Sequence, residues 1–183
     1  LDNFCWGDPR EPDRMAGLVR AAAGCYDAAV AFGTPFISGK DSLNNEWRLP
    51  NGERQPIPPT LLISALALTS DVTKSITMDL KAAGNLLYLV GETRNELAGA
   101  HVWDVVRDPA PADCALPRVK LNLAKQIFSA LHAAINARLV RSCHDLSEGG
   151  LAVAAAEMAF AGEVGASIDL AAIELSGDQS GFV

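Results

Sequence analysis

Two polar runs of this sequence carry residue types that could bind a metal ion and a phosphate. The first is SGKDSLNNE, over residues 38–46, and the second is HDLSEGG, over residues 144–150. A turn that only reverses the chain needs a glycine or an asparagine. An imidazole, carboxylates, hydroxyls and glycines within such short runs therefore indicate binding sites.

The first run combines a cation with oxygen donors. Lys40 supplies a point charge for a phosphate, and the oxygens of the run are the hard ligands that Mg²⁺ prefers. We expect nucleotide contacts from Lys40, Asp41 and Ser42, and metal contacts from Asp41, Asn45 and Glu46. The GxxxxGK[ST] spacing of a P-loop is absent. A solvated loop with an Asx turn would use the same residue types, so that interpretation stays open.

The second run precedes an apolar, helix-forming stretch. Gly149 and Gly150 at the start of a helix can expose free N–H groups to an anion. Asp145 could bind the metal, and Ser147 could cap the helix or hydrogen-bond a phosphate. In the alternative interpretation Ser147 is only a helix cap and His144 is a hydrogen-bonded core residue. The combination of all five residues favours the binding site.

The elements that position these runs alternate between helix and strand, which predicts a mixed α/β chain. Apolar spacing from Met15 to Val30 predicts a helix of about 20 residues, with Pro12 and Asp13 before it and Gly33 just past its end. It also predicts helices over residues 121–135 and 149–161. Apolar runs predict strands over residues 34–38, 60–68, 86–90, 140–144 and 166–170, although the run at 60–68 is also compatible with a helix. Prolines predict loops over residues 49–59 and 107–117. The polar stretch 71–83 predicts a boundary between two domains, residues 1–75 and 76–183.

Composition excludes several classes of protein. A hydrophobic fraction of 49% in 183 residues is sufficient for a core, and a net charge of -7 argues against a nucleic-acid partner. The four cysteines form no CxxC pair, which predicts reduced thiols and a cytoplasmic location. No apolar run approaches the roughly 20 residues of a membrane span, so no membrane partner is expected. The absence of an initiator Met predicts a piece of a longer protein.

Four motifs, taken in order, resemble one known family. FISGKDSLNNE, IPPTLLISALALTSDV, GNLLYLVGETRNELAGA and CHDLSEGGLAVAAAEMAF are similar to the C-terminal part of phosphoribosylformylglycinamidine synthase, a member of the aminoimidazole ribonucleotide (AIR) synthetase superfamily. The resemblance implies the latter half of an AIR-synthetase-like N-terminal domain, followed by the first part of an AIR-synthetase-like C-terminal domain.

The same resemblance implies a function. It predicts an ATP-dependent ligase of purine biosynthesis that converts formylglycinamide ribonucleotide and glutamine-derived ammonia to formylglycinamidine ribonucleotide, with Mg²⁺ and ATP or ADP bound. The implied partners are a glutaminase subunit, a small subunit and a second copy, contacted through the N-terminal domain. Alternatives are a non-catalytic half that holds a tightly bound ADP-Mg, or another ATP-dependent enzyme of the superfamily. No HNHP-like run occurs, so no catalytic base is assigned and the isolated chain is expected to be inactive.

Overall fold

The structure, a computed structural model, describes residues 1–173. It divides into two compact units, Leu1–Ser70 and Asp71–Val183. The assignment of residues 1–75 and 76–183 to two particular domains stays a prediction. The strand pattern expected to begin in SGDQSGFV lies outside the described residues.

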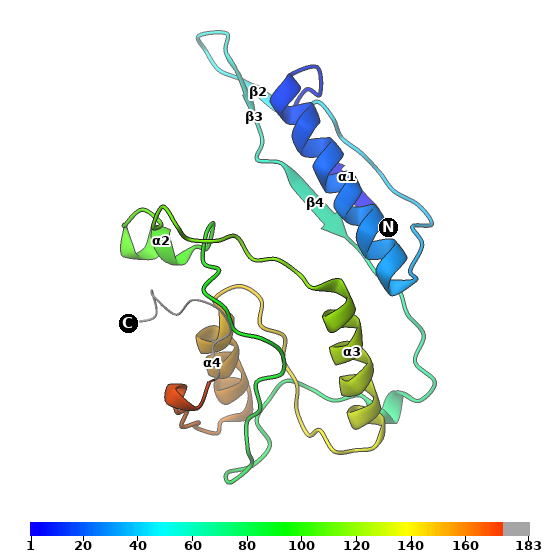
Figure 1. The fold of residues 1–183 in the computed structure, drawn as a ribbon, viewed down its shortest axis with the longest axis vertical. Helices are drawn as coiled ribbons and strands as arrows, with labels where there is room; N and C mark the ends of the chain where they lie inside the picture. Colours follow the sequence, from blue (N-terminus) through cyan, green and yellow to red (C-terminus); the bar gives the residue numbers. More distant parts are fainter. Residues whose placement is uncertain (174–183) are drawn as a thin grey trace. The chain divides into compact units, whose positions relative to one another are not determined.

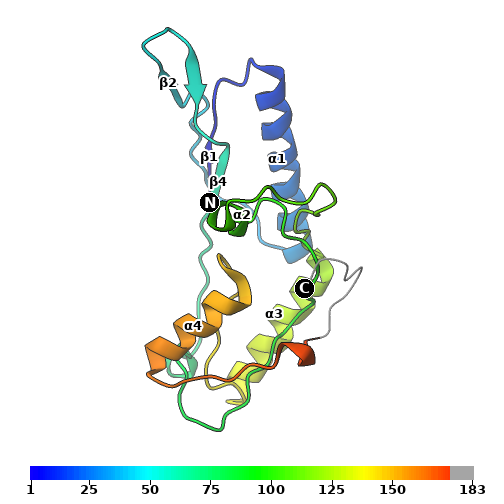
Figure 2. The ribbon, with the colours of Figure 1, turned by 90° about the vertical axis from the view of Figure 1, so that its left-hand side faces the viewer.

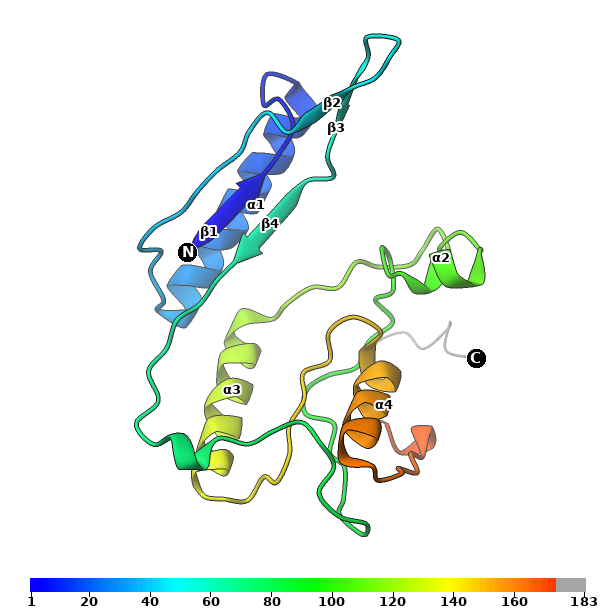
Figure 3. The same ribbon diagram turned by 180° about the vertical axis from the view of Figure 1, so that it is seen from behind.

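The first unit is built around β1 (Asp2–Cys5), a strand that the sequence did not predict. β1 pairs antiparallel with β4 (Thr60–Ile63), and Phe4 lies opposite Leu61 (Figure 3). Along the other edge of β1 the chain runs parallel to it, with bridges from Asp2 to Gly39 and from Cys5 to Ser42. β1 therefore lies between β4 and the run that contains Lys40.

Helix α1 (Pro12–Phe32) covers one face of this pair of strands (Figures 1 and 2). Proline stands at its first turn, and Gly33 ends it in the left-handed region at φ 71°. Trp6, only 5% exposed, donates from its indole nitrogen to the carbonyl oxygen of Arg14 at 3.0 Å. A Cβ atom at Gly17 would lie 3.5 Å from the same ring. The predicted helix is confirmed, and Trp6 fixes it against β1.

The length and composition of α1 correct one expectation from the sequence. Among residues 1–173 it is the one helix that is long and apolar enough to cross a membrane, with 21 residues and a mean hydropathy of 1.2. Alanines and valines give it this hydropathy. One such helix is weak evidence for a membrane span, because core helices of globular proteins have the same length and composition. In this structure Arg14 on α1 forms an ion pair with Glu46 of the same unit.

A hairpin replaces part of the predicted loop over residues 49–59. β2 (Glu46–Arg48) pairs antiparallel with β3 (Arg54–Pro56), and Gly52 in the connecting turn has φ 88°. Asn51-Gly52 is a common hairpin turn sequence and could have revealed the pairing. The hairpin begins directly at Glu46, the last residue of the first polar run.

The second unit contains three α-helices among its described residues. They are α2 (Val102–Val106), α3 (Leu121–Asn136) and α4 (Gly150–Gly162), with 3-10 turns η1 (Val72–Lys74) and η2 (Leu170–Ala172). The predicted helices over residues 121–135 and 149–161 and the loop over 107–117 are confirmed, and α2 was not predicted. Phe128 on α3 is 60% exposed.

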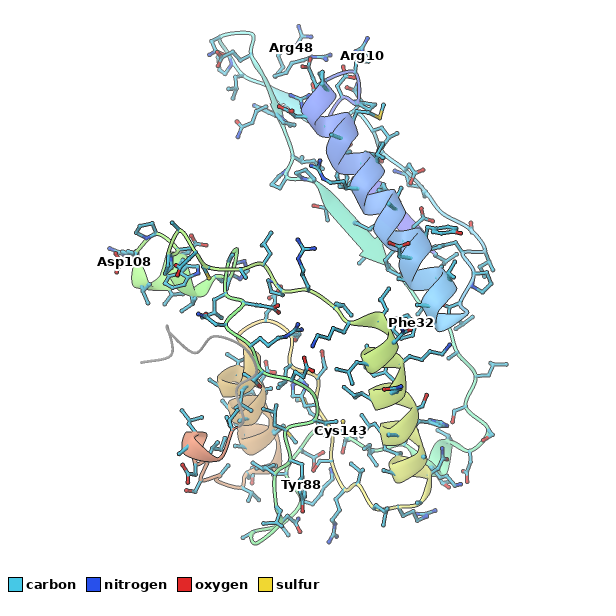
Figure 4. All side chains as sticks on the ribbon, viewed as in Figure 1. Arg10, Phe32, Arg48, Tyr88, Asp108 and Cys143 are labelled. Carbon is cyan, nitrogen blue, oxygen red and sulfur yellow. The ribbon has the colours of Figure 1, made fainter. Side chains whose placement is uncertain are left out.

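Most of the predicted strands are wrong. The run over residues 60–68 is a strand only at Thr60–Ile63, and residues 34–38 form no strand. Residues 86–90, 140–144 and 166–170 form none either. A strand needs a hydrogen-bonded neighbour, and the part of the second unit that the structure describes contains no paired strand. Tyr88, in the middle of one apolar run, is accordingly 80% exposed (Figure 4). The fold class, a mixed α/β chain, is nevertheless confirmed.

Gly7 and Gly24 should respond in opposite directions to alanine. A Cβ atom at Gly7 would lie 2.7 Å from the Cβ atom of Pro56, so Gly7→Ala should lower the free energy of unfolding by about 1–3 kcal/mol. Gly24, inside α1, has nothing within 4 Å, so Gly24→Ala should raise it by about 0.5–1 kcal/mol. Urea unfolding followed by circular dichroism measures both. Equal stabilities of the two variants would contradict the packing of Gly7, in the segment after β1, against Pro56 of the hairpin.

Candidate functional site

The first polar run is held as an extended segment against β1. The backbone N–H of Lys40 donates to the carbonyl oxygen of Asp2 at 3.0 Å, and that of Ser42 donates to Phe4 at 2.8 Å. The ammonium group of Lys40 donates to the hydroxyl of Ser42. Lys40 and Asp41 are exposed. This extended segment therefore presents a cation, a hydroxyl and a carboxylate, a set that suits a phosphate with its metal.

Glu46 lies in a different environment from the rest of this run. Its side chain is 5% exposed, and its Oε1 accepts from the backbone N–H of Asp8 at 3.0 Å and from the guanidinium of Arg14. Its Oε2 accepts no hydrogen bond but lies 3.4 Å from the guanidinium of Arg54. Two guanidinium groups would repel a divalent cation. In this arrangement Glu46 does not fit the role of a metal ligand, whereas Asp41 remains available for it.

Asp8 extends this buried group of charges. Arg10 donates to its carboxylate through Nε at 2.9 Å, and Arg54 approaches it to 3.3 Å. The hydrogen bonds from Arg10 hold the pKa of the Asp8 carboxyl well below its usual range. Figure 4 shows the labelled Arg10 and Arg48 at the same end of the first unit. The sequence pattern did not predict this cluster, although Asp8-Pro9-Arg10 just before a helix is an unusual concentration of charge.

The second polar run is organised by His144. One of its ring nitrogens, Nε2, lies 2.8 Å from a carboxylate oxygen of Glu157 on α4, and Nδ1 lies 3.1 Å from a carboxylate oxygen of Asp145. The hydrogen bond to Glu157 raises the pKa of His144, although burial opposes this shift. The pKa of Asp145 is lowered, first by its own backbone N–H and then by His144. Asp145 is therefore ionised, and with its side chain 82% exposed it fits a cation.

The start of α4 requires glycine. Gly149 is the N-cap residue at φ 81°, and a Cβ atom there would lie 2.1 Å from a methyl carbon of Val153. Among residues 1–173 no side chain caps this helix, so the alternative in which Ser147 is the cap is not observed, and its predicted phosphate contact stays a prediction. Ser147 instead contributes, as a minor cause, to the low pKa of Asp145. The first N–H groups of α4 have no side-chain acceptor at the cap, the arrangement in which a helix accepts an anion.

The predicted residues fall into two groups that belong to different units. Lys40, Asp41, Ser42, Asn45 and Glu46 lie in the first unit, and Asp145, Ser147, Gly149 and Gly150 lie in the second. Within residues 1–173, no three His, Cys, Asp or Glu side chains come together as a metal site. A shared magnesium site built from Asp41, Asn45, Glu46 and Asp145 therefore stays a prediction.

Comparison with known proteins identifies the family. Residues 82–181 match the family model described as "AIR synthase related protein, C-terminal domain", which is more than half of the chain. The chain belongs to this family. The matched range contains the HDLSEGG run and α4 with Glu157, but it does not reach the SGKDSLNNE run.

Similarity to individual relatives extends over nearly the whole chain. Proteins named "Phosphoribosylformylglycinamidine synthase subunit PurL" are 40% identical over 92% of the chain in Rhodopseudomonas palustris (strain BisB18) and 38% identical over 96% in Gluconobacter oxydans (strain 621H). The protein of that name from Thermococcus sibiricus (strain DSM 12597 / MM 739) is 33% identical over 98%. The chain spans 22%, 23% and 24% of the lengths of these relatives, respectively.

Glu157 is the member of the second group that the sequence pattern did not predict. It lies 13 residues after His144 and is the only charged residue of α4, whose sequence is GLAVAAAEMAFAG. A single carboxylate in such an apolar helix needs a polar partner. That need, together with the preceding histidine, was a signal that could have predicted the pair.

Removal of the charge of Glu46 should destabilise the first unit even without a metal. Glu46→Gln should lower the free energy of unfolding by about 2 kcal/mol, because it removes the buried counter-charge of Arg14 and leaves Arg54 with Asp8 alone. The exposed Glu53→Gln serves as the control and should change it little. Both are measured by urea unfolding in EDTA. A loss of stability that appears only when Mg²⁺ is added would instead make Glu46 a metal ligand.

The pair formed by His144 and Glu157 should make stability depend on pH. Because the pKa of His144 is raised above its ordinary value of 6.5, the pair stabilises the folded state fully below pH 6.5. This stabilisation is lost as pH rises through the raised pKa. Glu157→Gln should lower the pKa of His144 and flatten the pH dependence of unfolding above pH 6.5. Imidazole NMR signals measure the pKa, with those of His101 and His132 as internal references, and an unmoved His144 signal would refute the pairing.

Proposed function

We propose that this chain is part of the synthetase subunit of a phosphoribosylformylglycinamidine synthase, an ATP-dependent ligase of purine biosynthesis. The observation that carries this proposal is the similarity of 33–40% identity, over 92–98% of the chain, to proteins of that name. The substrates would be formylglycinamide ribonucleotide, ATP and glutamine-derived ammonia. In this reaction ATP phosphorylates the amide oxygen, and ammonia then displaces the phosphate.

In this proposal the two polar runs hold the metal-bound nucleotide. The ammonium of Lys40 and the hydroxyl of Ser42, which share one hydrogen bond, would contact a phosphate. The uncapped N–H groups at Gly149 and Gly150 would contact another. Exposed Asp41 and ionised Asp145 are the carboxylates that would hold Mg²⁺, which would neutralise the phosphate charge. Asn45 would add a neutral oxygen, and Glu46 would act through Arg14 by stabilising the fold.

The proposed partners follow from the same family. The relatives are named as subunits, which supports assembly with other chains, and a glutaminase subunit would supply the ammonia. A small subunit and a second copy, contacted through the first unit, complete the proposed assembly. A cytoplasmic location fits the four free cysteines. No nucleic acid or membrane is part of this proposal.

A second candidate function is a non-catalytic half that retains ADP-Mg as a structural ligand. The observation that favours it is that two possible bases already have partners, since Glu46 contacts arginines and His144 contacts Glu157. Neither group is free to act as a catalytic base in this arrangement. Both candidates use the same nucleotide contacts, so they differ in turnover rather than in binding. A different ATP-dependent reaction of the superfamily would share these contacts too.

The decisive experiment uses the complete protein that contains this chain. Asp145→Asn should reduce the Mg²⁺ and nucleotide that copurify with it, whereas Glu148→Gln, an exposed neighbour, should not. Metal analysis and nucleotide chromatography measure both. Retention of full nucleotide and metal content by Asp145→Asn would refute the proposed contact.

A second measurement separates catalysis from structural binding. If the bound nucleotide exchanges with labelled ATP at the rate of formylglycinamidine ribonucleotide formation, the site is catalytic; if it stays bound through many turnovers, it is structural. ATP turnover that requires a substrate other than formylglycinamide ribonucleotide would instead identify another reaction of the superfamily. The isolated 183-residue chain should show no synthetase turnover, and activity of the highly purified chain would contradict the assignment.

A further inference from the structure

A cavity of about 330 Å³ in the second unit lies outside both polar runs. It is formed where η1 and the following residues meet the C-terminal end of α3 and the segment after it. Its polar lining consists of hydroxyls and cations, namely Thr73, Ser75, Lys74, Lys81, Arg138 and Arg141. The volume is at the lower end of the range for small-molecule sites.

The charge of this lining is unusual for an acidic chain. The net charge is -7, yet four of the fifteen basic residues line this one cavity and no acidic residue does. Lys81 is partly neutralised, because its ammonium pairs with Asp79 just outside the lining. Within residues 1–173, the structure shows no hydrogen bond or ion pair on the side chains of Lys74, Arg138 and Arg141. Three cations that have no counter-charge among the described residues therefore line one small cavity.

The backbone of Arg138 adds an independent observation. Arg138 has φ 58°, in the left-handed region that favours glycine, at the position just after α3. Two backbone hydrogen bonds close the turn. The N–H of Arg138 donates to the carbonyl oxygen of Ile135 at 2.9 Å, and the N–H of Leu139 donates to that of Ala134 at 3.0 Å. A cation near the negative end of a helix gains some stability, but a glycine would fit this turn with less strain. The arginine side chain is thus present at a cost to the backbone.

We propose that this cavity binds a small di- or polyphosphate through Lys74, Arg138 and Arg141. A guanidinium group can bind a phosphate through two parallel hydrogen bonds, and Ser75 adds a hydroxyl to the lining. The hydroxyl of Thr73 donates to the carboxylate of Asp71 at 2.7 Å, so Thr73 is not counted among the contacts. Three unpaired cations match the charge of a diphosphate better than that of a single phosphate. The site shares no residue with the proposed nucleotide contacts, so it goes beyond the proposed function and does not depend on it.

Titration calorimetry of the 183-residue chain with inorganic pyrophosphate tests this proposal. The buffer contains EDTA, which prevents metal-mediated binding, and about 50 mM salt, which limits screening. Pyrophosphate should bind at one site, more tightly than orthophosphate or citrate, and more weakly at about 300 mM salt. Equal affinity for citrate would show that the cavity is a non-selective cationic surface and would overturn the proposal. The absence of pyrophosphate binding would overturn it too.

Arg138→Gly and Arg107→Gly form a matched pair of variants. Both arginines follow a helix of the second unit in the left-handed region, at φ 58° and φ 57°, but only Arg138 lines the cavity. Arg138→Gly should weaken pyrophosphate binding about tenfold without lowering the melting temperature, since glycine suits the turn. Arg107→Gly should leave the affinity unchanged.

Two further variants distinguish the cavity from the backbone turn and from the first polar run. Arg141→Gln should also weaken binding about tenfold, independently of any backbone effect at Arg138. Lys40→Gln, in the first polar run, should leave the affinity for pyrophosphate unchanged. A loss of affinity in this variant would place pyrophosphate at the proposed nucleotide site instead. Unchanged affinity in both Arg138→Gly and Arg141→Gln would overturn the proposal.

Discussion

The buried carboxylate of Glu46 is the constraint on which the first unit depends. It contacts the chain after β1 through the N–H of Asp8, α1 through Arg14, and the hairpin through Arg54. A buried charge is costly unless it is paired, so these three segments are stable only when all are in place. The SGKDSLNNE run ends at Glu46 and lies along β1. Its exposed Lys40 and Asp41 therefore lie on a segment that ends in a cluster of paired charges.

The sequence predicted those elements whose determinants are local. Pro12 and Gly33 mark the ends of α1, and Gly149 marks the start of α4, within a few residues of the periodic apolar pattern. Strands depend on partners that lie elsewhere in the chain. The four-residue β1 has its partners near residues 40 and 62, and no short-range sequence pattern predicts this pairing. Conversely, the apolar run around Tyr88 looks like a strand but has no paired neighbour within the described residues.

The candidate site was predictable in its residue types and not in its pairings. Lys40, Asp145 and the two glycines were recognised because each lies in a short polar run. The partners of Glu46 and His144 are 32 and 13 residues away along the chain, and only the folded structure shows which charges meet. These contacts determine the chemistry that the Glu46 and His144 side chains can perform. Glu46, predicted as a metal ligand, contacts Arg14 and Arg54 in this structure, and His144 contacts Asp145.

The same distinction applies to net charge. A net charge of -7 argues against a nucleic-acid partner, because binding to an extended phosphate backbone needs many cations over a large surface. A small anion needs only a few cations around one cavity, and their local field is not cancelled by carboxylates more than a Debye length away. Composition therefore constrains the large partners of this chain and leaves its small ligands undetermined. For small ligands, the informative property of a charged side chain is whether it is paired with an opposite charge in the fold. Arg14 is paired with Glu46, whereas Arg141 has no such partner among the described residues.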